Sequence, residues 1–205
     1  MGRTPGATAA STRERLLRAA ADVFARRGYA GTRVSEIAEA ADLSNGALYA
    51  YFGSKSDLLV DALRAHGRRM LDDVASGYPA RSISDLLLQT GRSLHLRRAP
   101  DDDLVIEGLV AARRDEQMAA PMRGFMREQA DWLAALVREA QVRGELDPGL
   151  SPAAVAHFCI SLAAGTALVT PDLNDVDDEE WAALLARLLA ALRAPHHREE
   201  MGSAG

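Results

Sequence analysis

The chain has 205 residues, of which 48% are hydrophobic, so it is long enough to bury a substantial core in one or two domains. A single cysteine, Cys159, excludes an internal disulfide and favours a reducing compartment. The first residues lack the apolar core of a signal peptide, and no apolar run reaches the roughly 18 residues that span a membrane. We therefore expect a soluble, cytoplasmic protein.

The net charge of −5 is unevenly distributed along the chain. Residues 1–55 carry a net charge of +3, whereas residues 56–205 carry −8. A basic N-terminal end is compatible with nucleic-acid contact, although a small helical segment can reach +3 by chance. Nearly all of the positive charge comes from 23 arginines, and the sole lysine is Lys55.

The first quarter of the chain is predicted to form three short helices. After a flexible tail over residues 1–11, apolar residues at helical spacing predict a helix over 12–27. A second apolar stripe predicts a helix over 34–41. Ser44 is then placed to cap a third helix over 45–51. We assign residues 12–54 to one small domain.

The rest of the chain is predicted to form longer helices, and residues 55–194 are assigned to a second, larger domain followed by a polar tail over 195–205. Pro121 marks a point where one of these helices could be interrupted, and Ser151-Pro152 is a strong start signal for another. No strand pattern is present, so the fold class is all-α. The helices are expected over residues 55–76, 82–98, 100–114, 118–143, 152–170 and 177–193.

Two acidic runs, at residues 101–103 and 177–180, raise the question of a metal site. Carboxylates in a first helical turn also complement the helix dipole, which is the preferred explanation here. His157 and Cys159 lie two residues apart on a helix and point to different sides. The sequence contains no phosphate-binding loop, nucleophile elbow or helical zinc motif. We therefore expect no metal, no cofactor and no enzymatic activity.

The three N-terminal helices have the arrangement of a helix-turn-helix. Apolar residues such as Ile37 and Leu48 would fix the angle between the second and third helices, so that the opposite side of the third helix lies in a major groove. An ordinary three-helix packing unit with a solvated polar face is the alternative. The positions on that side are polar or small, as DNA contact requires: Ser44, Asn45, Gly46, Tyr49 and Ala50.

A more detailed pattern runs through residues 12–59. Its residues are Arg13, Leu16, Leu17, Ala19, Ala20, Phe24, Gly28, Val34, Ile37, Ala38, Ala41, Leu43, Leu48, Tyr49, Tyr51, Phe52, Lys55, Asp57, Leu58 and Leu59. In order and spacing, this segment resembles the DNA-binding region of the tetracycline-repressor (TetR) family of bacterial regulators. The rest of the chain is similar to the family in being helical and of the usual length.

The resemblance implies that nine residues contact DNA. Lys55 matches the family's phosphate-contacting lysine, and its ammonium would add to the anion site at a helix N-terminus. Asn45 matches a base-reading position, where an amide can pair with adenine N6 and N7. Side-chain hydroxyl groups would donate hydrogen bonds to DNA phosphates. The remaining candidates are Thr32, Arg33, Ser35, Ser44, Gly46, Tyr49 and Tyr51.

The last two predicted helices are unusually apolar. The helix over 152–170 is apolar nearly all round, and that over 177–193 carries a wide leucine stripe. The resemblance implies that these helices pair with a second subunit as a four-helix bundle. One large monomeric core is the alternative. The candidate interface residues are Phe158, Leu162, Gly165, Trp181, Leu185 and Leu188.

A methionine-rich stripe on the helix over 118–143 is a candidate pocket for an apolar or aromatic small molecule. Its helical spacing is more often that of a plain core. The residues considered for the pocket are Met118, Met122, Phe125, Met126 and Trp132, with Arg92, His95 and Glu107 as polar anchors on preceding helices.

Together these features predict a homodimeric, ligand-responsive, sequence-specific DNA-binding transcriptional regulator. A repressor released from a palindromic operator by a small-molecule effector is favoured over an activator. The helix over 55–76 joins the two domains and would act as the lever. The alternative is a helical small-molecule-binding or enzymatic protein that retains the helix-turn-helix only as a scaffold.

Overall fold

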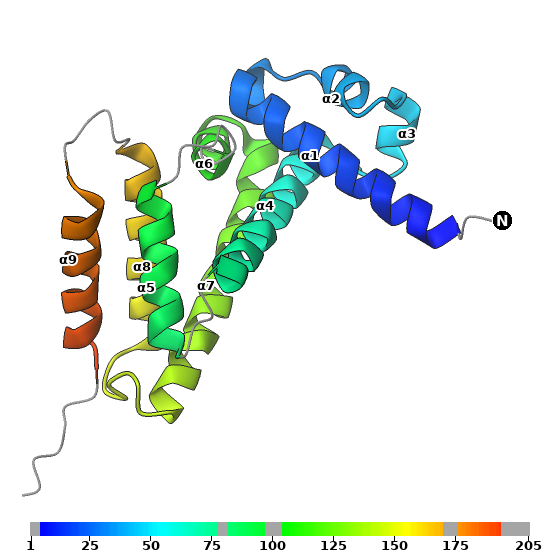
Figure 1. Cartoon of the computed structure of the whole chain (residues 1–205). Helices are drawn as coiled ribbons and strands as arrows, with labels where there is room; N and C mark the ends of the chain where they lie inside the picture. Colours follow the sequence, from blue (N-terminus) through cyan, green and yellow to red (C-terminus); the bar gives the residue numbers. More distant parts are fainter. Residues whose placement is uncertain (1–4, 78–81, 97–103, 170–175, 194–205) are drawn as a thin grey trace, which may run out of the picture.

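The N-terminal helices of the computed structural model form a compact unit at one end of the molecule (Figure 1). The structure describes residues 5–77, 82–96, 104–169 and 176–193, with the side chains of 5–8, 70–77, 83 and 93–96 left aside, and all its regular elements there are α-helices. This confirms the all-α fold class. The first four helices are α1 (Pro5–Gly31), α2 (Val34–Ala40), α3 (Asn45–Tyr49) and α4 (Lys55–Gly77).

Helices α4 and α7 run from this unit into the rest of the molecule, where α5, α8 and α9 lie side by side (Figure 1). Polar side chains cap three of the later helices. Asp115, Ser151 and Asp177 accept backbone N–H groups at the starts of α7, α8 and α9. The bounds are α5 (Ile83–Leu96), α6 (Leu104–Arg114), α7 (Glu116–Val142), α8 (Pro152–Leu168) and α9 (Asp178–Ala191).

Two helices differ from the prediction. Helix α1 begins at Pro5, so residues 5–11 are helical and do not form a tail. Proline is well suited to the first turn of a helix, where its missing N–H has no partner to lose. Helix α7 runs through Pro121 without interruption. Pro121 lies close to the start of that helix, so the one backbone hydrogen bond it removes is near an end that already carries unpaired N–H groups.

One buried core joins the N-terminal helices to the larger part of the chain. Leu16 and Phe24 of α1 belong to the same buried cluster as Leu104 of α6 and Met118 of α7. A smaller second cluster, which includes Val137, lies between α7 and α8. The predicted boundary at residue 54 therefore does not separate two hydrophobic cores.

Helices α4, α6 and α7 approach closely at Gly108. A Cβ atom at this position would lie 3.1 Å from Sδ of Met122 and 3.2 Å from Cδ1 of Leu63. The absence of a side chain at Gly108 therefore lets the three helices pack together beneath the N-terminal unit. Among the described helices, none has a stretch long and apolar enough to cross a membrane.

Candidate nucleic-acid interface

The turn between α2 and α3 sets the angle of a helix-turn-helix. Ile37 and Leu48 are almost completely buried and hold the two helices together. The backbone N–H of Leu43 donates to the carbonyl of Ala38 at 2.9 Å, which closes the turn. Asp42 reaches the tight turn through a positive φ of 52°, a conformation that aspartate tolerates better than most side chains.

Helix α3 presents a polar side to solvent. Ser44 caps the helix by accepting the N–H of Ala47 at 3.2 Å, so its own hydroxyl hydrogen is available for a second acceptor. Tyr49 has 54% of its surface exposed and Tyr51 36%. Because Leu48 is buried, the exposed residues lie on the side that could enter a groove. The exposed residues of this segment are Ser44, Asn45, Gly46, Tyr49, Ala50 and Tyr51.

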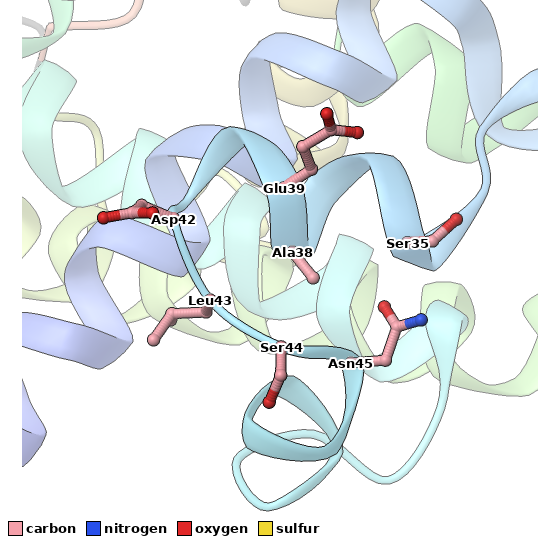
Figure 2. A pocket seen from close by; sticks show the side chains of 7 residues that line it. All are labelled: Ser35, Ala38, Glu39, Asp42, Leu43, Ser44 and Asn45. Carbon is pink, nitrogen blue, oxygen red and sulfur yellow. The ribbon is translucent and has the colours of Figure 1, made fainter.

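An open hollow of about 440 Å³ lies between α2 and the start of α3. Figure 2 shows the side chains of Ser35 and Asn45 on the same side of the turn, while Asp42 and Leu43 extend to the other. Ser35 and Asn45 are both exposed, so both groups remain available to an external partner. The lining residues are Ser35, Ala38, Glu39, Asp42, Leu43, Ser44 and Asn45.

Lys55 is the first residue of α4 and follows Tyr51 by four residues in the chain. Ser54 caps α4 by accepting the N–H of Asp57 at 3.1 Å. The Lys55 ammonium lies 4.4 Å from the ring centroid of Tyr29. Burial lowers the pKa of Lys55, while the negative charge of Asp115 acts in the opposite direction. A half-exposed cation at a helix N-terminus is well suited to an anionic partner such as a phosphate.

The predicted role of Thr32 as a phosphate donor is wrong. Its side chain is 3% exposed, and its hydroxyl donates to the backbone carbonyl of Gly28 at 2.8 Å. Nor does Thr32 cap α2: Arg33 holds the cap position, and its N–H donates to Glu36 at 3.0 Å. The side chain of Arg33 is exposed and remains a candidate for DNA contact.

The methionine-rich stripe of α7 lies largely in the core. Met118, Met122 and Phe125 are at most 5% exposed and belong to the cluster that contains the α1 core. Met126 is half-buried against the same cluster, whereas Trp132 is 41% exposed. Helical spacing identified the buried face but could not show that it packs against protein. The placement favours the plain-core alternative for these residues.

Two of the three polar anchors proposed for a ligand, Arg92 and Glu107, can be placed in the structure. Arg92 is exposed on α5, and the side chain of His95 lies outside the described residues. Glu107 faces the N-terminal unit, where one of its carboxylate oxygens accepts the N–H of Tyr29 at 3.3 Å. Tyr29 was missed by the sequence analysis, although an aromatic residue directly after a helix-breaking glycine was a usable signal.

The candidate interface residues fall into two groups. Phe158 and Leu188 are 47% and 40% exposed, whereas Leu162 and Gly165 are half-buried. Two other members pack within the subunit, against α5. Leu185 is 6% exposed and would lie 2.9 Å from a Cβ at Gly91, and the indole N–H of Trp181 donates to the Gly91 carbonyl at 3.3 Å.

A helix-turn-helix with an exposed polar second helix and a cation at the start of the next helix defines a DNA-binding transcriptional regulator. The family described as "Bacterial regulatory proteins, tetR family" matches residues 16–62, and "Tetracyclin repressor-like, C-terminal domain" matches residues 81–189. The second match alone covers more than half of the chain. The protein belongs to the TetR family of bacterial regulators.

The similarity to curated relatives and solved structures extends over most of the chain. The probable HTH-type transcriptional regulator ArpR of Pseudomonas putida is 31% identical over 207 residues, with 90% of this chain and 96% of ArpR covered. UidR of Escherichia coli is 25% identical, with coverages of 83% and 84%. The structure of Salmonella enterica GusR superposes with a TM-score of 0.72 at 24% identity, covering 89% of this chain and 95% of GusR.

Proposed function

We propose that the protein is a homodimeric repressor that binds a palindromic operator and is released from it by a small molecule. The observation that carries the DNA-binding part is the exposed polar side of α3 beside Lys55. Asn45 would read a base edge there, while Lys55 and Ser44 would bind phosphates. A regulator of similar sequence, KstR2 of Rhodococcus jostii, is named a transcriptional repressor, at 32% identity with 68% of this chain and 72% of KstR2 covered.

Exposed apolar side chains on α8 and α9 support the dimer. Phe158 and Leu168 of α8 are 47% and 59% exposed, and Leu184 and Leu188 of α9 are 49% and 40% exposed. Burying such side chains against a second copy would gain about 25 cal/mol for each Å² removed from water. A two-fold dimer would then place its two α3 helices in successive major grooves about 34 Å apart.

Helix α4 is the proposed connection between effector and DNA. It carries Lys55 at its first residue and contributes Leu63 to the buried contact with α6 and α7. An effector that binds the larger part of the chain would favour a conformer in which the two α3 helices no longer match successive grooves. A coupling free energy of about 1–3 kcal/mol is typical of such regulation.

Selection of duplexes from a random DNA pool, followed by fluorescence anisotropy with the purified full-length protein, tests this function. We expect enrichment of a palindrome whose half-sites are about one helical turn apart, or a multiple of it. A compound screen on the enriched duplex then identifies the effector by release of the protein. Absence of binding to any duplex, even at low salt, would refute the proposal and favour the scaffold alternative.

A further inference from the structure

Tyr29 lies where the end of α1 meets the start of α4. The residue is 8% exposed, and its ring stacks on Phe24 with centroids 6.0 Å apart. The ring also faces the ammonium of Lys55, whose Nζ lies 4.4 Å from the centroid. An aromatic ring attracts a cation at this distance through its quadrupole. Tyr29 is therefore anchored in the core and in contact with the protein's sole lysine.

The backbone at Tyr29 is held from α6. Its N–H donates to Oε2 of Glu107 at 3.3 Å. The preceding residue, Gly28, has φ 69° and ψ 165°, a backbone region that is essentially confined to glycine. A Cβ atom at Gly28 would lie 3.0 Å from Oε2 of Glu107, and the Gly28 carbonyl accepts the hydroxyl of Thr32. The Gly28–Tyr29 segment is thus fixed on both sides, with Glu107 as its contact on α6.

We propose that Tyr29 is a positioning residue: its ring holds the Lys55 ammonium at the start of α4 in place for a DNA phosphate, and Glu107 keeps Tyr29 there. This inference rests on the proposed phosphate-binding role of Lys55. It adds a defined connection between the larger part of the chain and the proposed phosphate contact, because Glu107 lies in the segment matched by the C-terminal family domain. A displacement of α6 would then reach the phosphate contact without any movement of α3.

The physical advantage is a smaller entropic cost of binding. A lysine side chain has four flexible methylene groups and loses rotamer freedom when its ammonium is fixed on a phosphate. Contact with the Tyr29 ring restricts those rotamers before DNA arrives. A lysine ammonium has three N–H donors, so contact with one face of a ring does not occupy all of them. Burial of Lys55, which also lowers its pKa, strengthens the attraction to the ring.

Because Lys55 is the sole lysine, isotope labelling of lysine gives a direct test on the intact protein. The side-chain NMR signal of Lys55 should be shifted upfield by the ring of Tyr29. Tyr29→Phe should preserve this shift because the ring remains, whereas Tyr29→Leu and Glu107→Ala should move the signal towards that of a free lysine. Circular dichroism would establish that the variants are folded. An unshifted wild-type signal, or one unchanged in Tyr29→Leu, would overturn the proposal.

A double-mutant cycle on the selected duplex tests the consequence for DNA binding. Tyr29→Leu should weaken binding about fivefold per subunit, because the Lys55 side chain regains rotamer freedom that it must lose again on a phosphate, and Tyr29→Phe should restore it. In a Lys55→Ala background, Tyr29→Leu should have no further effect. An equal loss in both backgrounds would overturn the positioning role alone. A Lys55→Ala variant with wild-type affinity and salt dependence would overturn the proposed phosphate role as well.

Discussion

Arg64 on α4 and Glu128 on α7 form a two-point contact, with the guanidinium Nε and Nη2 at 2.9 and 2.7 Å from the two carboxylate oxygens. Arg64 also donates from Nη1 to Asp61 at 2.9 Å, and Asp61 lies 2.5 Å from Arg13 of α1. A chain of paired charges therefore runs from α1 across α4 to α7. These ion pairs connect the outer sides of α1, α4 and α7, and the apolar sides of the same three helices belong to the main core.

Replacing Glu128 by Gln should destabilise the protein by about 0.5–1 kcal/mol at neutral pH, since both groups are partly exposed to solvent. The hydrogen bonds from Arg64 lower the pKa of Glu128 below its ordinary value of 4.5. The stabilisation should therefore be complete above that value and disappear as the pH falls through the lowered pKa. Urea unfolding of wild type and variant across this range measures the difference.

The matched control for this experiment is Glu139→Gln, because Glu139 pairs with Arg143, the residue that caps the C-terminal end of the same helix. It should show a smaller change, since it does not join two helices. A difference between wild type and Glu128→Gln that persists unchanged in acid, well below the lowered pKa, would contradict an origin in the charged carboxylate.

Lys55→Ala should weaken binding to all duplexes and should have little effect on the protein's discrimination between DNA sequences. Each phosphate contact that is lost should lower the slope of log affinity against log salt by about 0.9. Fluorescence anisotropy over a salt series measures this slope. Arg138→Ala removes the same charge from an exposed position in the second half of α7 and should leave the slope nearly unchanged. An unaltered slope in Lys55→Ala would mean that Lys55 contacts no phosphate.

Asn45→Ala should change the specificity of DNA binding. The loss of a bidentate amide contact should remove about 1–3 kcal/mol of discrimination at a single half-site position. Repeating the duplex selection with the variant would show that position as degenerate. If every half-site position kept its preference, Asn45 would not be the base-reading residue.

Phe158→Glu and Leu188→Glu should each convert the proposed dimer to a monomer, because both place a charge on an exposed apolar position of α8 or α9. Light scattering after size-exclusion chromatography measures the mass, and DNA affinity should fall with it. Val142→Glu is the control, since Val142 is 89% exposed at the end of α7 and should tolerate the charge. A persistent dimer in both variants would place the interface elsewhere.

Gly28→Ala and Gly124→Ala should have opposite effects on stability. Gly28 occupies a backbone region that costs other residues about 1–3 kcal/mol, and the added methyl would press on Glu107. Gly124 is inside α7 with no neighbouring atom near its Cβ direction, so alanine there should stabilise by about 0.5–1 kcal/mol. Thermal unfolding compares the two. A neutral Gly28→Ala variant would contradict the strained conformation.

The helices could be predicted from local signals because their start residues act within one turn. Ser151 followed by Pro152 identified the start of α8, and Ser44 that of α3. The role of Thr32 was predicted wrongly because a hydroxyl can donate a hydrogen bond to a DNA phosphate or to its own backbone equally well. In the folded chain the Thr32 hydroxyl donates to the Gly28 carbonyl four residues back, a backbone acceptor that a threonine hydroxyl commonly uses.

The packing partners of each apolar face could not be predicted, because periodicity reveals that a face is buried and not what covers it. Leu185 is the clearest case. Its position in a leucine stripe was compatible with a second subunit, yet Gly91 of α5 provides the space for it within the same chain. The buried stripe of α7 raised the same ambiguity, and its cover proved to be the core shared with α1.

The shared core has a consequence for exchanging operator specificity between family members. A fragment ending near residue 62 would leave exposed the apolar residues that Leu104, Met118 and Met122 cover in the intact chain. Transplanting the N-terminal segment of another regulator would therefore require compatible shapes at these three positions as well as at Glu107. Grafting only the exposed residues of α2 and α3 leaves these buried contacts unchanged. It is therefore the better route to a hybrid with altered operator preference.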